Sequence, residues 1–370
     1  MIDLLYISYV DLDGGEASGS GVRPVKMKEA FEDEGISLKI LDGWPKNKAK
    51  RRADIEALSQ WLDNDRASYC YVEPPSGPLF LREDRKLIRK IHDKGIPIGL
   101  FYRDIYWRYP RQFYKGQAVK GWVIRKMAER DLRLFQKTVD HLFFPSETMA
   151  RIADFGIPWS ALPPGAILQS SEAAYQKDID RLSEIGPLTL LYVGGIKGDS
   201  GLDLLLEALN RVNQEKVKFR LLLCCRKEEW MEFTKINSVS EPNWLQVHHA
   251  SGKALKPLYD QADLTIVPRK KTEYMDFSMP VKLFESVGFL KPVIVTNCKS
   301  MADFVERFEI GWVSRDQADD MAGLLGRLFG DRKDILSKKK ALPSCLEANS
   351  WELRARTVIE EMKGIHVQRR

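Results

Sequence analysis

A cation and a carboxylate stand three residues apart, at Lys282 and Glu285, in the segment MPVKLFESVGFLKPVIV, residues 279–295. Residues at this spacing share one face of a helix, and Pro280 favours a helix that begins at this point. The first turn of a helix offers free N–H groups and a partial positive charge, so it can bind a phosphate, and Lys282 can add a point charge. Glu285 is then placed to accept hydrogen bonds from a hydroxylated group such as a ribose. The alternative is a solvated salt bridge on a surface helix, and the spacing alone leaves both interpretations open.

A second candidate phosphate site is the glycine-containing turn in YVGGIKGDSGLDLLLEAL, residues 192–209. This turn follows an apolar run typical of a strand and leads into a helical segment. Glycines let backbone amides approach a phosphate closely, and Lys197 lies inside the turn. The alternative is an ordinary strand-to-helix turn that needs positive φ angles.

Both candidate sites belong to a pattern in which short apolar runs alternate with longer amphipathic segments. Strands that are apolar on both faces and separated by helices indicate parallel sheets covered on both sides. The predicted strands are residues 4–10, 69–74, 96–102, 141–145, 189–195, 219–225, 264–268 and 292–296. The clearest predicted helices are residues 25–35, 82–95, 201–213, 256–262 and 280–288. We therefore predict an α/β protein.

The alternation pauses between residues 162 and 187, where prolines and polar residues gather. A length of 370 residues also favours about two domains. We predict a first domain over residues 1–165, a linker over 166–187, a second domain over 188–345 and a terminal helix within 346–370. Ser350 is the expected N-cap of that helix.

Composition excludes several classes of protein. With 44% hydrophobic and 30% charged residues the chain is typical of a globular protein, and no apolar run approaches the roughly 18 residues of a membrane span. The first ten residues are predicted to form a strand rather than a signal peptide. Neither a net charge of +6 nor any motif indicates nucleic-acid binding. The five cysteines lack the spacing of a zinc site, so we expect them to be buried, reduced thiols in a cytosolic protein. His248 and His249 have no third metal ligand at a useful spacing, so we do not expect them to bind a metal.

The order and wording of four segments carry a family resemblance. They are YVGG…GLDLLLEAL, LYDQADLTIVP, MPVKLFESVGFLKPVIVTN and GWV. The chain resembles glycosyltransferases of the GT-B fold, close to the large retaining family 4, and the pattern P-x-K-x-x-E followed by P-V-I is its most specific signal. The first half matches more loosely, through DLDGGEASGSGVRPVKMKEAF, and SWELRA is similar to the final helix, which crosses back onto the first domain.

This resemblance implies two Rossmann-like doubly wound domains facing a cleft, with the nucleotide-sugar donor on the second domain and the acceptor on the first. It also implies retention of anomeric configuration, no cofactor and no bound metal. Glu285 would bind the ribose, while Lys197 and Lys282 would stabilise the leaving diphosphate. The other positions that the resemblance assigns to the donor are Gly15, Gly194, Gly195, Arg226, Ser278, Met279 and Val281.

The chain departs from the family pattern at two places. Many relatives have a glutamate eight residues before the ribose-binding one, where this chain has Phe277, and Glu273 and Asp276 are nearby substitutes. Many relatives also have an arginine and a lysine in the phosphate turn, where this chain has Gly195 and Ser200. Lys197 is the candidate replacement. These departures keep two alternatives open, a catalytically silent GT-B scaffold subunit and a nucleotide-sugar epimerase on the same fold.

On the acceptor side we place Arg23 and Arg103, together with Asp104, which follows a predicted strand. Asp104 could orient an acceptor hydroxyl or act as a base. The alternative is an ion pair of Asp104 with Arg103 or Arg108 that merely shapes the loop.

Aromatic and basic residues are mixed in the segment FYRDIYWRYPRQFYKGQAVKGWVIRKM, residues 101–127. Such a mixture suits the surface of an anionic membrane, so we expect a glycan or a lipid-linked acceptor and a cytoplasmic protein that contacts the inner face of the cell membrane. A partly buried helix whose long basic side chains reach the solvent is the alternative. The lysine run at residues 338–340 is interpreted as a solvated helix face.

Overall fold

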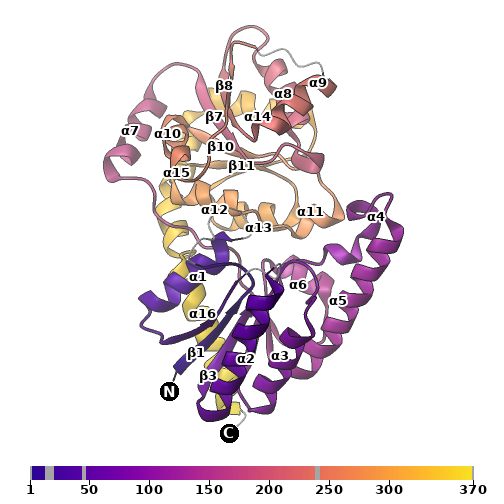
Figure 1. The fold of residues 1–370 in the computed structure, drawn as a ribbon. Coiled ribbons are helices and arrows are strands. Elements are labelled where there is room, and N and C mark those ends of the chain that lie inside the picture. Colours follow the sequence, from indigo (N-terminus) through magenta and orange to yellow (C-terminus); the bar gives the residue numbers. More distant parts are fainter. Residues whose placement is uncertain (1, 13–20, 44–46, 238–241, 369–370) are drawn as a thin grey trace. The chain divides into compact units, whose positions relative to one another are not determined.

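The chain folds into two compact units in the computed structural model, which describes residues 2–12, 21–43, 47–237 and 242–368 (Figure 1). Unit 1 comprises residues 1–165 and 351–370, and unit 2 comprises residues 166–350. The boundary predicted after residue 165 coincides with the limit of unit 1. None of the described helices is long and apolar enough to cross a membrane.

Unit 1 contains a parallel six-stranded sheet in the order β2-β1-β3-β4-β5-β6. Its strands are β1 (Ile2–Ser8), β2 (Leu38–Leu41), β3 (Ala67–Glu73), β4 (Ile98–Phe101), β5 (His141–Phe144) and β6 (Trp159–Ala161). Its helices are α1 (Val22–Asp33), α2 (Lys48–Asn64), α3 (Arg82–Asp93), α4 (Pro110–Phe113), α5 (Ala118–Thr138), α6 (Glu147–Ala153) and α16 (Trp351–Gln368). Consecutive residues Leu4, Leu5 and Tyr6 are fully buried, as expected for a strand covered on both faces.

The terminal helix α16 belongs to unit 1. Trp351, Val358 and Met362 of α16 are buried in one cluster with Tyr6 and Phe31. The chain approaches Trp351 so closely at Gly165 that an added Cβ would lie 2.6 Å from the indole ring. The helix therefore completes the core of unit 1, although residues 166–350 separate it from the rest of that unit in sequence.

Unit 2 contains a second parallel six-stranded sheet, in the order β12-β11-β10-β7-β8-β9. Its strands are β7 (Leu188–Val193), β8 (Phe219–Cys224), β9 (Leu245–His248), β10 (Leu264–Val267), β11 (Val293–Thr296) and β12 (Gly311–Ser314). Its helices are α7 (Glu172–Ser183), α8 (Leu202–Val212), α9 (Lys227–Asn237), α10 (Lys256–Gln261), α11 (Glu273–Phe277), α12 (Val281–Gly288), α13 (Lys299–Arg307), α14 (Ala318–Gly330) and α15 (Arg332–Glu347). The predicted pair of doubly wound Rossmann-like domains is confirmed.

The strand order of unit 2 reverses between β7 and β10. From β7 the chain moves outward to β8 and β9, then returns to the other side of β7 as β10 and continues outward. Open α/β sheets bind ligands in the crevice outside the carboxyl ends of the strands at such a reversal. The loops that follow β7 and β10 are therefore the first place to look for a site.

The prediction of a linker over residues 166–187 and that of a solvated lysine run at residues 338–340 are both wrong, for the same reason. The predicted linker contains α7, and Asp178 of α7 is buried and accepts hydrogen bonds from Lys291 and Lys339 at 2.5 and 2.8 Å. Arg181 donates to the same carboxylate at 3.1 Å. Lys339, the middle residue of the run interpreted as a solvated face, is only 1% exposed. A buried carboxylate needs cations around it, and tertiary packing supplies them from distant segments.

Candidate active site

The helix α12 begins where the sequence indicates. Pro280 precedes its first residue in an extended conformation, and Leu283, Phe284 and Val287 are buried. Lys282 and Glu285 share the opposite face, as predicted.

Lys282 and Glu285 form a salt bridge in this structure. The Lys282 ammonium lies 2.8 and 2.7 Å from the two carboxylate oxygens of Glu285. The side chains are 35% and 29% exposed, respectively. The ion pair named as the alternative interpretation is thus present, and its partial exposure leaves the carboxylate accessible to a ligand.

Tyr259 of α10 contacts the carboxylate of Glu285 and helps to fix its position. Its hydroxyl donates to Glu285 Oε2 at 3.3 Å, and its ring stacks on Phe289 with centroids 4.0 Å apart. Burial, followed by the nearby Glu285 charge, raises the pKa of Tyr259 well above its ordinary value. The phenol therefore stays protonated and keeps its role as a donor to the carboxylate.

Two hydrogen bonds and a close backbone contact fix the glycine turn after β7. Ile196 donates its N–H to Glu229 Oε2 of α9 at 2.9 Å, and Tyr192 donates its hydroxyl to the carbonyl of Gly195 at 2.6 Å. Gly201 has φ +73°, and an added Cβ would lie 1.6 Å from the carbonyl oxygen of Pro268. The turn after β7 consequently packs directly against the loop after β10, and only glycine fits at the contact.

Two of the predicted donor-binding cations point toward α9. Lys197 is exposed and its ammonium pairs with Glu232, which raises the pKa of Lys197. Arg226 is 82% exposed and lies 3.5 Å from Glu229. Both cations thus lie close to carboxylates of α9. The sequence analysis did not predict that α9 lies beside the glycine turn.

The loop after β10 brings a cation that the sequence analysis missed. The guanidinium of Arg269 donates to the hydroxyl of Ser278 at 2.6 Å, just before α12 begins. Desolvation by burial lowers the pKa of Arg269. The available signal was its position directly after the strand-like run LTIVP, since strand ends at a reversal point line the ligand crevice.

Phe277 is buried, which explains an apolar residue at this position. Phe277 is 2% exposed and packs its ring against Tyr274. The carboxylate of Asp276, a candidate substitute, accepts a hydrogen bond at 3.0 Å from the N–H of Lys299 at the start of α13, while Glu273 is exposed. Asp276 therefore has a structural partner at the start of α13.

Part of unit 2 matches a known protein family. Residues 187–331, which contain the glycine turn, Arg269 and α12, match the family model of glycosyl transferases group 1. The matched segment lies within unit 2. No curated protein matches the chain in sequence.

Solved structures match the chain over nearly its full length. Sucrose-phosphate synthase from Thermosynechococcus elongatus is 14% identical with a TM-score of 0.68, covering 99% of this chain and 100% of that chain. WaaG, a glycosyltransferase involved in lipopolysaccharide biosynthesis, is 15% identical with a TM-score of 0.62, covering 98% and 100%. HepE from Anabaena, solved in complex with UDP-glucose, is 12% identical with a TM-score of 0.64, covering 98% and 99%. These similarities show that the chain has the GT-B fold.

In unit 1, a buried carboxylate joins the two predicted acceptor-side arginines. Glu73, at the end of β3, is 1% exposed and lies 3.1 Å from both Arg23 and Arg103. Arg23 also stacks over Phe101 at 3.5 Å and donates to the carbonyl of Leu162. The prediction of a direct acceptor contact for Arg23 is therefore corrected to a packing role, because its guanidinium is buried and fully engaged. The sequence analysis missed Glu73, although it ends a predicted strand.

Asp104 lies in the loop after β4 and lines a pocket of unit 1 with Tyr102, Trp107 and Asp131. Its carboxylate accepts a hydrogen bond from the N–H of Tyr106 at 2.9 Å, which shapes a 3₁₀ turn over Tyr106–Arg108. The predicted catalytic role of Asp104 stays a prediction. Gly15 lies outside the described residues.

Proposed function

We propose that the chain transfers a sugar from a nucleotide-diphosphate donor, bound on unit 2, to a saccharide or lipid-linked acceptor. The observation that carries the proposal is the face of α12, where Glu285 is held by Lys282 and Tyr259 at the carboxyl edge of the sheet. A partly exposed carboxylate with fixed orientation is suited to two ribose hydroxyls. The start of the same helix offers N–H groups to a diphosphate.

The chemistry that this arrangement supports is departure of the nucleoside diphosphate. Negative charge grows on the leaving group as the glycosidic bond breaks, and preorganised cations and helix-end amides stabilise it. Lys282 is placed for this role once a ribose competes for Glu285. Retention of configuration and independence from metal belong to the proposal, and product stereochemistry by NMR and activity in excess EDTA test them.

Binding of nucleotides to unit 2 tests the donor site. We expect UDP, GDP, ADP or TDP, or one of the corresponding sugars, to raise the melting temperature of the wild type, because a ligand that binds the native state stabilises it. Glu285→Ala should lower the affinity for that nucleotide by at least about tenfold, since it removes charge-assisted hydrogen bonds. The exposed Glu215 provides the matched control variant Glu215→Ala. Unchanged affinity for UDP and GDP in Glu285→Ala would contradict the assignment.

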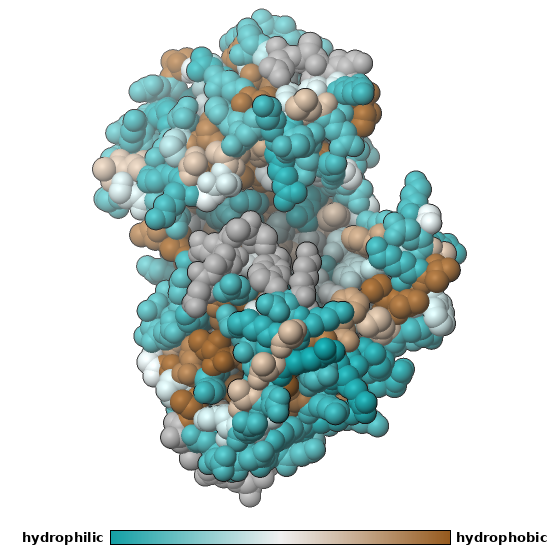
Figure 2. All heavy atoms as spheres, viewed as in Figure 1, coloured by the Kyte–Doolittle hydropathy of each residue, from teal (hydrophilic) through white to brown (hydrophobic). Residues whose placement is uncertain are grey.

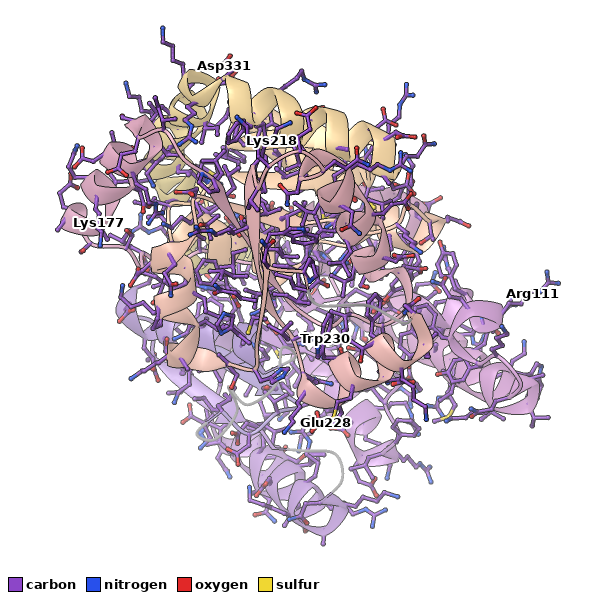
Figure 3. The ribbon with its side chains drawn as sticks, turned by 90° about the horizontal axis from the view of Figure 1, so that it is seen from above. Arg111, Lys177, Lys218, Glu228, Trp230 and Asp331 are labelled. Carbon is purple, nitrogen blue, oxygen red and sulfur yellow. The ribbon has the colours of Figure 1, made fainter. Side chains whose placement is uncertain are left out.

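The acceptor side of the proposal rests on an apolar and basic surface of unit 1. Its exposed apolar side chains, which we call the α4–α5 patch, are Phe113, Val119, Trp122 and Val123, at 41, 78, 61 and 40% exposure. Arg111 points outward from α4 (Figure 3), and Lys115 and Lys120 are exposed beside it. Figure 2 shows brown apolar atoms interspersed with hydrophilic ones on this part of unit 1.

We infer that the α4–α5 patch contacts an anionic membrane at the cytoplasmic face, where a lipid-linked acceptor would be presented. Exposed aromatic residues among basic ones match the headgroup region of such a membrane. All five cysteines are buried and outside any disulfide, which suits a reducing compartment.

Co-sedimentation with vesicles tests the α4–α5 patch. The wild type should sediment with vesicles containing phosphatidylglycerol and stay in the supernatant with phosphatidylcholine alone. Trp122→Ser should reduce sedimentation, while Met231→Ser, which removes an equally exposed apolar residue from unit 2, should not. Equal sedimentation of all three proteins would remove the membrane from the proposal and leave the donor site untouched.

A further inference from the structure

The phosphate turn of unit 2 carries few cations of its own. Residues 194–201 contain a single cation, Lys197, and one carboxylate, Asp199. Lys197 is exposed and its ammonium is paired with Glu232 of α9. A diphosphate bound at this turn therefore needs positive charge from another segment.

The loop after β10 is fixed next to this turn by backbone contacts. Lys270 donates its N–H to the carbonyl of Asp199 at 3.0 Å, and Gly201 leaves no room for a side chain against Pro268. On the other side, the Thr296 hydroxyl donates to the carbonyl of Arg269 at 2.5 Å. The backbone of Arg269 is thus held between the phosphate turn and the end of β11.

The side chain of Arg269 is directed toward the start of α12. Its guanidinium donates to Ser278 Oγ at 2.6 Å and lies 3.5 Å from the sulfur of Met275. It also interacts electrostatically with Tyr192, whose hydroxyl donates to Gly195 in the phosphate turn. Arg269 consequently lies between the two elements that would hold the diphosphate.

Arg269 carries a charge that the surrounding protein does not balance. Among the residues that the structure describes, no carboxylate oxygen lies within ion-pair distance of its guanidinium, whereas Arg23, Arg103 and Arg181 each pair with one. Desolvation lowers the pKa of Arg269 but leaves it positively charged at neutral pH. Arg269 is partly buried, so its guanidinium is partly desolvated, and an anionic ligand would compensate that desolvation.

We infer that Arg269 binds the diphosphate of the donor, with Ser278 orienting its guanidinium, and so supplies the charge that the phosphate turn lacks. The inference rests on the proposed function of unit 2. Arg269 follows β10 and donates to Ser278 just before α12, while its neighbour Lys270 is bonded to the turn after β7. The planar guanidinium suits this task because it can donate two parallel hydrogen bonds to phosphate oxygens.

The test compares nucleoside diphosphates with their nucleosides. UDP, GDP, ADP and TDP are titrated into the wild type, and the one that binds is then compared with its nucleoside in each variant. Arg269→Met should weaken the diphosphate by about 10- to 100-fold, as expected when a charge-assisted hydrogen bond is lost, and leave the nucleoside unchanged. Arg269→Lys should recover part of the loss. Lys270→Met, which removes a neighbouring cation that is paired with Asp203, should stay within about threefold of the wild type.

The nucleoside measurement separates a binding defect from a folding defect, because a misfolded site would lose both ligands. Wild-type diphosphate affinity in Arg269→Met, together with weakened binding in Glu285→Ala, would overturn the role of Arg269 and leave the proposed function standing. Loss of the diphosphate in Lys197→Met but not in Arg269→Met would assign the charge to the phosphate turn instead. If none of the four diphosphates binds the wild type, the proposed function itself fails.

Discussion

Neutralising Asp178 should destabilise unit 2 far more than removing one of its cationic partners. Asp178 is buried and shared by Lys291 and Lys339, whose side chains are 3% and 1% exposed. Asp178→Asn leaves both ammonium groups buried with neutral acceptors alone, namely the new amide oxygen and the carbonyls of Ala262 and Leu290. In Lys291→Met, by contrast, Asp178 keeps Lys339, and the Ala262 carbonyl keeps Arg181 as a donor at 2.7 Å.

The expected difference follows from what each change leaves behind. Removing one partner of a buried ion pair costs about 3–5 kcal/mol when a charge is left uncompensated, so Asp178→Asn should lose at least that much. For a unit of this size, residues 166–350, each kcal/mol lowers the melting temperature by about 2–4 °C. We therefore expect a fall of roughly 6–20 °C. Lys291→Met should change the free energy of unfolding by less than about 1.5 kcal/mol, because a methionine of similar length replaces a costly buried charge.

The pH dependence gives a second readout of the same network. Burial lowers the pKa of Lys291 from its ordinary 10.5 to about 8, and it also lowers the pKa of Lys339. Between pH 8 and 10.5 the unfolded chain thus binds more protons at Lys291 than the folded chain does, so this residue contributes stability that rises with pH in that window. Below pH 8 both states are protonated and the contribution is constant. The deficit of Asp178→Asn relative to the wild type should therefore shrink as the pH rises from 7 to 10, because its two lysines can lose their protons.

Urea unfolding followed by circular dichroism, with thermal melts at pH 7, 8.5 and 10, measures both effects. The reasoning is refuted if Asp178→Asn costs less than Lys291→Met at pH 7. A deficit of Asp178→Asn that grows with pH would refute the assignment of uncompensated ammonium groups.

Three further outcomes are expected. Gly201→Ala should abolish nucleotide binding in titration calorimetry and lower the melting temperature, because its Cβ would overlap a backbone carbonyl, whereas Gly198→Ala, at φ +59° in open space, should cost only about 1 kcal/mol. Glu73→Gln should destabilise unit 1 by about 3–5 kcal/mol in urea unfolding, since it leaves buried Arg23 uncompensated, and a cost below 1 kcal/mol would contradict the described network. Glu34→Gln is its control, because Glu34 forms only a surface pair, and it should cost at most about 1 kcal/mol. Sugar transfer should be unaffected by excess EDTA, and recovery of lost activity by added Mg²⁺ or Mn²⁺ would show that charge stabilisation needs a metal.

Local sequence patterns determined the elements of this protein and the residues that share a helix face. Alternating apolar and amphipathic runs predicted the parallel strands, because strands buried on both faces must be apolar throughout. Pro280 located the start of α12, and the spacing of Lys282 and Glu285 placed both on the same side of it. These features depend on residues a few positions apart, so one sequence is enough to predict them.

Which charges are buried and which are free was decided only by the tertiary structure. The sequence analysis assigned a phosphate to Lys197 and overlooked Arg269, yet Lys197 pairs with Glu232 on the surface while Arg269 is held beside Ser278. Lys339 stands in an apparently solvated lysine run and is nevertheless buried on Asp178, which lies 161 residues away in sequence. A charge enters the interior only where a partner from another segment compensates its desolvation, and such partners become visible only when the chain has folded.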